Sequence, residues 1–435
     1  MKKAIRFIDL FAGLGGMRLG LERACLELNL KVECVFTSEI KPNAVRTYQE
    51  NFPNSKVWGD IRIIPSEEIP DFHLLLAGFP CQAFSTAGMR QGFADTRGTL
   101  FFEVERILRD KQPDGFILEN VAGLVTNNKG ETLKTILHIL KNLGYFVTCE
   151  VLNALDFGVP QDRKRIYIVG MRSHSLSLKD IPTSKPVPLS HILETGKPTL
   201  KSEFIDKLLS HYSMEELAGK SIKDKRGGKN NIHSWDIDLR GKTNATQKQL
   251  LNLLLKERRK KKWAKLKGIK WMDGMPLTLE EITSFFAPEH LFEFEDLRTL
   301  LDDLVAKNYL AFEHPKDEVE VLNNNNQKVK KRLARMDLPK GYNLVTGKLS
   351  FEISKILDPN EFAPTLVATD MERLAVIDGE GLRKLTIREG LKLFGFCDRY
   401  QIDLPEKKAF DLLGNTVVVS VMEKISDRLL RTKHL

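Results

Sequence analysis

The first 170 residues alternate short apolar runs with longer segments in which apolar positions recur at helical spacing. This alternation is typical of a parallel sheet covered by helices. The expected strands are Ile5–Phe11, Val32–Phe36, Leu74–Ala77, Gly115–Leu118, Tyr145–Leu152 and Arg165–Gly170. The expected helices are Gly13–Leu28, Pro42–Asn51, Leu100–Arg109 and Glu131–Asn142. We therefore predict an α/β, Rossmann-like fold for this part of the chain.

The pattern changes after Met171. Four prolines crowd residues 182–198, which marks a linker. Residues 200–345 lose the alternation and become lysine-rich and helical, and the α/β pattern returns only at the apolar run that begins at Leu412. The sequence therefore predicts a catalytic domain that is interrupted by a mainly helical inserted domain. The predicted bounds are 1–185 and 404–435 for the catalytic domain and 186–403 for the insertion.

Within the insertion, Gln247–Leu266 has the pattern of one helix with an apolar stripe. Its predicted outer face is basic and carries Arg258, Arg259, Lys260, Lys261 and Lys262. Side chains of this kind contact phosphates and position a duplex without reading its sequence. The net charge of the chain is +9, and residues 220–273 hold 17 Lys and Arg against 5 Asp and Glu. Such a concentration is expected of a module that faces a polyanion, although a solvated charged helix is the alternative.

A second pattern in the insertion covers residues 276–322. Thr278 and Glu281 form a capping box that opens a short helix, and apolar residues at helical spacing follow from Leu297. The last expected elements are two strands, Tyr309–Glu313 and Val319–Leu322, paired as a hairpin. Two helices and a β-wing are typical of a winged-helix module, which would place its second helix in the major groove. A helical subdomain that merely packs the insertion is an equally compatible interpretation.

Composition narrows the class of protein. The 435 residues contain no apolar stretch that approaches the ~18 residues of a membrane span. The N-terminus runs directly into a predicted strand, so we expect no signal peptide. Five cysteines without a Cys-x-x-Cys pair argue against a disulfide framework or a zinc site. We therefore expect a cytoplasmic protein with no membrane segment and no metal.

Cys81 lies just beyond the predicted strand Leu74–Ala77, in the segment Gly78-Phe79-Pro80-Cys81. Ligands of open α/β sheets bind beyond the carboxyl ends of the strands. A thiol at this place is therefore positioned to act as a nucleophile. Glu119, at the end of the next strand-like segment, could supply the acid that such a nucleophile needs.

A glycine-rich turn, Gly13-Leu14-Gly15-Gly16, joins the first predicted strand to the first predicted helix. Glycines let the backbone approach a ligand closely. Glu39 and Asp60 follow at the ends of the next two strand-like segments, where a carboxylate can hold ribose hydroxyls. The turn alone could be a simple tight turn. Together with both carboxylates it favours an adenosyl cofactor without phosphates, namely S-adenosylmethionine.

Six segments agree, in order, with the motifs of one family. They are Asp9–Gly16, Pro80-Cys81-Gln82, Glu119-Asn120-Val121, Gln161–Arg165, Arg383–Glu389 and Gly414–Val417. The chain thus resembles the cytosine-5 DNA methyltransferases, and the insertion corresponds to their variable target-recognition region. Two positions depart from the family pattern, because Cys397 stands where proline is usual and Lys392 where arginine is common. Both lie away from the residues expected to react.

The resemblance implies roles for individual residues. Cys81 would add to carbon 6 of cytosine, Glu119 would hydrogen-bond to N3, and Arg163 and Arg165 would orient the base and its phosphates. Residues 83–98 resemble the family's mobile loop, which closes over a flipped base. The implied cofactor contacts are Phe11, Ala12, Gly13, Leu14, Gly15, Gly16, Glu39, Ile40, Asp60, Ile61, Pro80, Leu100, Asn415 and Thr416. The expected DNA contacts are Gln82, Ser85 and Gln161, besides the basic residues of the insertion.

The resemblance implies transfer of a methyl group from S-adenosylmethionine to carbon 5 of a flipped cytosine in a short duplex sequence. The expected context is a restriction-modification system. Double-stranded DNA is the expected partner, a cognate restriction endonuclease acting on the same site is a candidate second one, and monomeric action is expected. An RNA cytosine methyltransferase and a non-catalytic DNA-binding regulator of the same fold are alternatives. The presence of Cys81, Glu119 and both arginines weighs against the regulator.

Overall fold

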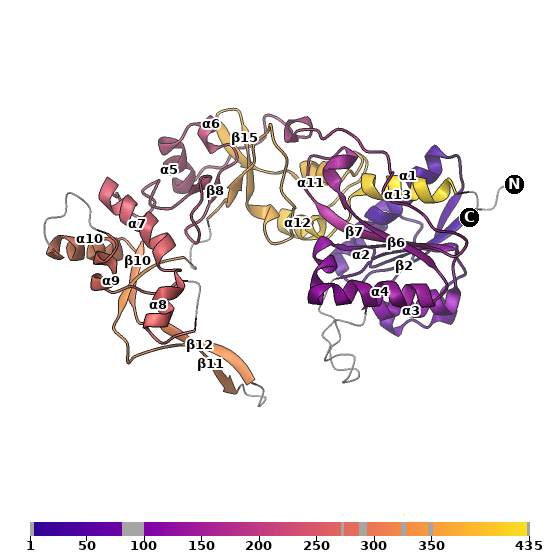
Figure 1. The fold of residues 1–435 in the computed structure, drawn as a ribbon. Helices are drawn as coiled ribbons and strands as arrows, with labels where there is room; N and C mark the ends of the chain where they lie inside the picture. The colour runs from indigo at the N-terminus through magenta and orange to yellow at the C-terminus, as the bar shows by residue number, and fades with distance from the viewer. Residues whose placement is uncertain are drawn as a thin grey trace. The chain divides into compact units, whose positions relative to one another are not determined.

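A computed structural model describes residues 4–80, 100–270, 274–286, 294–322, 328–346 and 351–432 of the chain (Figure 1). The chain divides into two compact units. The first unit comprises Met1–Gly196, Asp358–Glu372 and Leu385–Leu435, and the second unit comprises Lys197–Leu357 and Arg373–Lys384. Each unit has its own hydrophobic core, and each is described by itself below.

The first unit is built on a seven-stranded sheet with the strand order β3-β2-β1-β4-β5-β7-β6. Its strands are β1 (Ile5–Leu10), β2 (Val32–Ser38), β3 (Val57–Trp58), β4 (Leu74–Gly78), β5 (Gly115–Val121), β6 (Phe146–Asn153) and β7 (Lys164–Met171). The five strands from β3 to β5 are parallel, and β7 is antiparallel to both of its neighbours. This arrangement confirms the predicted α/β, Rossmann-like fold. The carboxyl ends of β1, β2, β4 and β5 therefore meet at one edge.

Helices cover both faces of this sheet (Figure 1). The helices of the first unit are α1 (Gly16–Glu27), α2 (Pro42–Asn51), α3 (Leu100–Lys111), α4 (Glu131–Asn142), α11 (Ile387–Leu393), α12 (Glu406–Gly414) and α13 (Val419–Leu430). Apolar residues of α3 and α4, such as Ile107 and Leu140, pack in one cluster with the sheet residues Leu75, Phe116 and Ile168. This cluster is the core between the sheet and the helices α3 and α4.

The contact between α1 and α13 depends on glycine. A Cβ atom on Gly20 would lie 2.4 Å from Cβ of Met422, and one on Gly16 would lie 2.7 Å from the carbonyl oxygen of Val417. Real Cβ atoms do not approach other atoms so closely, so the two helices could not keep their separation with larger residues. The predicted glycine-rich turn therefore ends in a residue whose small size serves helix packing.

We expect Gly20→Ala to lower the free energy of unfolding by about 1–3 kcal/mol, because overpacking at the α1–α13 contact outweighs the helix propensity that alanine adds. Gly59→Ala is the matched control, because a Cβ at Gly59 would meet nothing within 4 Å. Urea unfolding of both variants measures the difference. A Gly20→Ala protein that is more stable than the native chain would show that the contact tolerates a methyl group.

The compact units differ from the predicted domains at their boundaries. The predicted insertion included all of residues 358–403. In the structure, residues 358–372 and 385–403 belong to the first unit, and only the segment 373–384 between them belongs to the second. The reason is burial, since Leu391, Leu393 and Phe394 lie in the interior. A parallel bridge between Gln161 and Ala363 also joins this part of the chain to the segment before β7. Such long-range contacts leave no local signal in the sequence.

The second unit combines helices with small sheets. Its helices are α5 (Glu203–His211), α6 (Met214–Leu217), α7 (Ala245–Glu257), α8 (Lys261–Leu266), α9 (Leu279–Thr283) and α10 (Phe294–Ala306). Its strands are β8 (Ser221–Ile222), β9 (Asn231–Ile232), β10 (Leu310–Glu313), β11 (Lys316–Leu322), β12 (Lys328–Ala334), β13 (Gly341–Leu344), β14 (Lys355–Ile356), β15 (Leu374–Asp378) and β16 (Gly381–Lys384). One core lies beside the sheet β16-β15-β14-β8-β9, and another joins α7, α9, α10 and β13.

Two predictions for the insertion are wrong in detail. Gln247–Leu266 is not one helix, because the carbonyl of Arg258 accepts a hydrogen bond from the backbone N–H of Met275 (2.7 Å) and the chain breaks between α7 and α8. The strand at Tyr309–Glu313 does not pair with Val319–Leu322. Instead β10 pairs with β13, and β11 pairs with β12. The capping box of Thr278 and the helix that contains Leu297 are both confirmed.

Candidate active site

A cavity of about 600 Å³ opens at the carboxyl ends of β1, β2, β4 and β5. Most of the predicted catalytic and cofactor residues line it, although they come from segments far apart in the sequence. The predicted cofactor contacts among them are Phe11, Gly13, Glu39, Ile40, Asp60, Ile61, Pro80, Leu100 and Asn415. The predicted catalytic residues among them are Glu119, Arg163 and Arg165. The fold therefore brings three acidic residues, Glu39, Asp60 and Glu119, and two arginines to a single cavity.

Five of the predicted cofactor contacts are not among the residues that line this cavity, namely Ala12, Leu14, Gly15, Gly16 and Thr416. Packing explains the two glycines. A Cβ on Gly15 would lie 2.6 Å from the ring of Phe52, and Gly16 packs against the carbonyl of Val417. Leu14 and Thr416 are buried in the protein interior. The second half of the turn, Gly15 and Gly16, therefore packs against other residues of the protein and does not line the cavity.

The carboxylate of Glu39 organises the first half of the turn. Its Oε2 accepts a hydrogen bond from the backbone N–H of Gly13 (2.9 Å), and its Oε1 accepts bonds from the N–H groups of Ile40 and Lys41 (both 2.8 Å). Phe11 and Gly13 adopt positive φ angles of 55° and 54°. The carboxylate thus ties the loop after β1 to the end of β2, and it holds both loops at the rim of the cavity.

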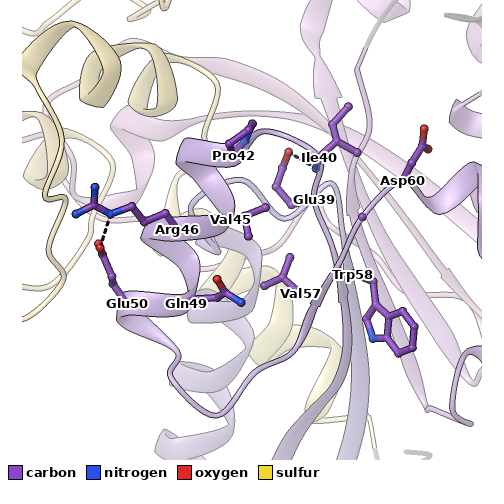
Figure 2. A pocket seen from close by; sticks show the side chains of 11 residues that line it. Glu39, Ile40, Pro42, Val45, Arg46, Gln49, Glu50, Val57, Trp58 and Asp60 are labelled. Atoms are coloured by element: carbon purple, nitrogen blue, oxygen red, sulfur yellow. Dashed lines mark hydrogen bonds and ion pairs between the residues drawn. The ribbon is translucent and has the colours of Figure 1, made fainter.

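A second hollow, of about 850 Å³, adjoins the first along α2 and β3. Figure 2 shows Glu39, Ile40 and Asp60 at one end of it and Arg46, Gln49 and Glu50 at the other. Glu39, Ile40 and Asp60 line both hollows. The two predicted cofactor carboxylates therefore stand at the border between the cavity and a wider depression of the surface.

Glu119 is the buried acid of the cavity. It lies near the end of β5 and is 8% exposed, and its Oε1 lies 3.2 Å from Nε of Arg165. Burial raises the pKa of the Glu119 carboxyl, and the positive charges of Arg165 and Arg163 oppose that rise without cancelling it. A carboxyl with a raised pKa keeps its proton to higher pH, which suits a hydrogen-bond donor or general acid.

Asn120 fixes the segment that leads into Cys81. Its Nδ2 donates a hydrogen bond to the carbonyl oxygen of Phe79 (2.9 Å), and its Oδ1 accepts one from the N–H of Val121 (2.8 Å). Asn120 lies in the Glu-Asn-Val motif, but the motif alone predicts no role for it. Asn120 therefore positions the backbone two residues before Cys81. Cys81 itself, with Gln82 and Ser85, lies outside the described residues.

Arg163 lines the cavity, and its guanidinium is engaged by backbone carbonyl groups. It is 3% exposed, and its guanidinium donates hydrogen bonds to the carbonyl oxygens of Leu366 (2.8 Å), Thr416 (2.9 Å) and Gly414 (3.3 Å). The guanidinium also lies 5.0 Å from the ring of Phe394. Burial, followed by the charge of Arg165, lowers the pKa of Arg163 to about 10. The structure therefore makes Arg163 a positioning residue that ties the C-terminal segment to the sheet.

Replacing Arg163 with methionine should lower the free energy of unfolding by about 3 kcal/mol or more, because buried carbonyl groups would lose their donors. Arg172→Met is the matched control, since Arg172 is exposed and its side chain hydrogen-bonds only to Gln112 among the contacts described for it. Surface changes of that kind usually cost less than ~0.5 kcal/mol. Differential scanning calorimetry measures both, and equal melting temperatures would contradict the role.

Two predicted DNA contacts are not supported, because their side chains are buried. Gln161 is fully buried, and its amide donates to the carbonyl oxygen of Leu393 (2.8 Å) and accepts from the N–H of Leu366 (3.3 Å). Arg258 is 2% exposed and donates to Oδ1 of Asn343 (3.1 Å). Both residues therefore stabilise their own unit. The resemblance implied the DNA contact for Gln161, and helical periodicity placed Arg258 on the outer face, since neither contains information about packing by distant segments.

The other basic residues of the predicted helix remain accessible. Lys260, Lys261 and Lys262 are exposed, and Arg259 is half-buried. Lys260 and Lys262 both form ion pairs with Glu257, the latter at 3.8 Å. The ammonium of Lys262 also lies 4.1 Å from the ring centre of Trp263. Part of this charge is therefore already engaged with neighbouring groups.

Across the described ranges, no group of three or more His, Cys, Asp or Glu side chains is arranged to hold a metal ion. In the same ranges, no helix is both long enough and apolar enough to cross a membrane.

Comparison with known proteins gives a consistent result. The model of the C-5 cytosine-specific DNA methylase family matches residues 5–431. The chain is 55% identical to the Type II methyltransferase M.NlaIV of Neisseria lactamica, over 98% of this chain and 99% of the relative. It is 39% identical to the Type II methyltransferase M.BanI of Aneurinibacillus aneurinilyticus, over 98% and 95% of the two chains.

Solved structures agree at the level of the fold. The S. pombe Dnmt2 methyltransferase superposes with a TM-score of 0.54 at 15% identity, over 99% of this chain and 100% of the other. The Entamoeba histolytica methyltransferase EhMeth superposes with a TM-score of 0.51 at 16% identity, over 99% of each chain.

Proposed function

The chain belongs to the family of C-5 cytosine-specific DNA methylases, and from this premise we propose a covalent mechanism centred on Cys81. The protein is a DNA cytosine-5-methyltransferase. In the proposed reaction, S-adenosylmethionine gives its methyl group to carbon 5 of a flipped cytosine in a short duplex sequence. The observation that carries the proposal is the cavity itself, which joins Glu119 and Arg165 to Pro80, the residue directly before Cys81.

The cavity suits the proposed methyl donor. Two carboxylates, Glu39 and Asp60, stand at its rim, and the apolar side chains of Ile40 and Ile61 lie beside them. Its volume of about 600 Å³ falls within the range of small-molecule sites. We propose that the carboxylates bind the ribose hydroxyls and that Phe11, Pro80, Leu100 and Asn415 contact the rest of the molecule. When bound, the sulfonium supplies an electrophilic methyl group.

Cytosine needs activation before its carbon 5 can react. In the proposed mechanism the Cys81 thiolate forms a bond to carbon 6, and the electrons of the 5,6 double bond become available at carbon 5. Negative charge moves toward N3, where the protonated carboxyl of Glu119 donates a hydrogen bond. After methylation, loss of the proton from carbon 5 and of the thiolate from carbon 6 restores the aromatic ring. Arg165, 3.2 Å from Glu119, holds this carboxyl in place.

Neither carbon 5 nor carbon 6 is accessible at the required angle inside stacked duplex DNA, so the proposal includes base flipping at a cost of a few kcal/mol. Gln82 and Ser85 are proposed to contact the DNA near the base. Arg259 and Lys260 to Lys262 are proposed to contact phosphates, although the ion pairs with Glu257 reduce the charge available. Monomeric action in the cytoplasm completes the proposal.

Bisulfite sequencing of DNA from a host that expresses the protein tests the proposed reaction. We expect unconverted cytosines at a single short sequence with the native chain and none with Cys81→Ala. Complete conversion of every cytosine with the native chain would contradict the proposal. The named relatives are Type II methyltransferases, and we propose that this chain is likewise the modification enzyme of a restriction-modification system. The methylated sequence should then resist a restriction endonuclease that cuts the same site.

A further inference from the structure

The second unit contains a two-stranded hairpin with an unusual charge distribution. Among the described strands, β11 and β12 pair only with each other, in an antiparallel register that runs from Lys316 opposite Ala334 to Leu322 opposite Lys328. Figure 1 shows this hairpin extending beyond the helices of its unit. An isolated hairpin is only marginally stable in water. A groove of duplex DNA, in contrast, accepts a two-stranded ribbon.

The elements around the hairpin follow the order of a winged-helix module. α8, the bridging residue Leu277, α9, α10 and β10 precede the hairpin, and β13 follows it. Leu277 pairs with Tyr342 of β13, which in turn pairs with β10. This order makes β11 and β12 the wing, and it makes α10 the second helix of the helix-turn-helix pair α9–α10. In helix-turn-helix proteins that second helix usually lies in the major groove.

The charges of α10 oppose that usual placement. The segment Phe294–Ala306 contains four carboxylates and a single arginine. Its apolar residues Leu297, Leu301 and Leu304 are buried in the core, so the exposed face includes Asp296 and Asp302. The phosphates that border the major groove are anionic, and carboxylates near them are repelled. The structure therefore argues against α10 as the main DNA-contacting element.

The strand β12 has the opposite character. Its sequence, Lys-Val-Lys-Lys-Arg-Leu-Ala, contains four cations and no acid, and all four cationic side chains are exposed. The neighbouring strand carries acids that engage some of them. Glu318 pairs with Lys330 (2.9 Å), and Glu320 pairs with Lys328 (3.7 Å). These pairs are exposed to solvent and are therefore weak.

Two cations of β12 remain without an ion pair to any carboxylate in the described part of the chain, namely Lys331 and Arg332. Adjacent residues of a strand point to opposite faces. Arg332 lies opposite Glu318 in the register and Lys331 lies opposite Val319, so the hairpin presents one such cation on each face. This distribution fits a ribbon whose two faces meet the two phosphate walls of one groove.

We propose that the hairpin β11–β12, and not α10, is the element of the second unit that enters a groove of the DNA, with Lys331 and Arg332 on the phosphates of its two walls. The partner is the duplex DNA of the proposed function, on which this inference rests. The proposal assigns the hairpin a positioning role on the duplex, because phosphate contacts carry no sequence information.

The test measures binding of the full-length protein to mixed-sequence duplex DNA by fluorescence anisotropy at several salt concentrations. Loss of two phosphate contacts should reduce the slope of log Kd against log salt by about 1.8, which corresponds to roughly 30-fold weaker binding near 0.15 M salt. We expect this change in the variant K331Q/R332Q. The matched control R298Q, which removes the arginine of α10, should change binding less than about threefold.

A third variant keeps the test informative if K331Q/R332Q folds poorly. E318Q/E320Q removes the hairpin acids and should tighten binding, because it releases Lys330 and Lys328. Unchanged binding in both hairpin variants, or a larger loss in R298Q, would overturn the inference. Methyl transfer by the native chain to the same DNA is measured in parallel. If that activity is absent, the proposed function fails; if it is present while the hairpin variants bind normally, only the hairpin proposal fails.

Discussion

Replacing Cys81 with alanine should reduce methyl transfer by at least ~10³-fold, which is the largest effect of a single substitution that we expect in this protein. Without the sulfur, carbon 5 keeps the low reactivity of an aromatic ring, and no other group in the proposed mechanism takes over the addition to carbon 6. A free thiol with a pKa near ~8.5 already offers some thiolate at neutral pH, which an alanine or serine cannot replace.

Transfer of a radiolabelled methyl group to DNA measures this effect. Cys149→Ala is the matched control, because Cys149 is a half-buried free cysteine in β6 that is not among the residues lining the cavity. The control should retain activity within about twofold of the native chain. Substantial methyl transfer by Cys81→Ala would show that another group activates the base.

Glu119→Gln should lower the rate by about 10²- to 10⁴-fold, the range typical of a lost general acid. Glutamine keeps the size of the side chain but cannot supply a proton to N3. Because the pKa of Glu119 is raised, the native rate should fall as the pH rises through that pKa and the carboxyl loses its proton. The variant should lack this decline. Single-turnover rates between pH 5 and pH 9 measure both quantities.

Glu119→Gln should lower activity, but it should not lower stability at high pH. A group whose folded pKa is raised binds its proton more tightly in the folded state, so its stabilising contribution is present at low pH and is lost as pH rises through the folded pKa. Glutamine mimics the protonated form at every pH. We therefore expect Glu119→Gln to be at least as stable as the native chain at pH 8. A lower melting temperature of the variant at pH 8, but not at pH 5, would show that the ion pair with Arg165 outweighs burial.

The parts of the site that follow from strand ends were predictable from the sequence. Glu39, Asp60 and Glu119 each lie at or near the end of a strand-like segment, and parallel strands that end at one edge must bring such residues together. The glycine-rich turn was recognised by the same local reasoning. Its detailed role was not, because the contact of Gly16 with Val417 joins segments about 400 residues apart.

The remaining errors share one physical cause, which is burial by distant segments. The resemblance assigned Gln161 to the DNA, and the helical pattern placed Arg258 at the surface, yet both side chains are buried, as is that of Arg163 beside the cavity. Their partners are the carbonyl groups of Leu393 and Leu366 and the side chain of Asn343, all remote in sequence. The pairing of β10 with β13 likewise joins segments that are separated in the sequence by the hairpin β11–β12, so local patterns do not predict it.

Covalent capture of DNA that contains 5-fluorocytosine in place of cytosine is the most direct measurement of the proposed sulfur–carbon bond. Fluorine at carbon 5 cannot depart as a proton does, so the adduct cannot resolve after methyl transfer. With S-adenosylmethionine present, we predict a protein–DNA complex that survives denaturing electrophoresis for the native chain and is absent for Cys81→Ala. A native chain that methylates ordinary DNA fully, yet never forms this complex, would contradict the mechanism.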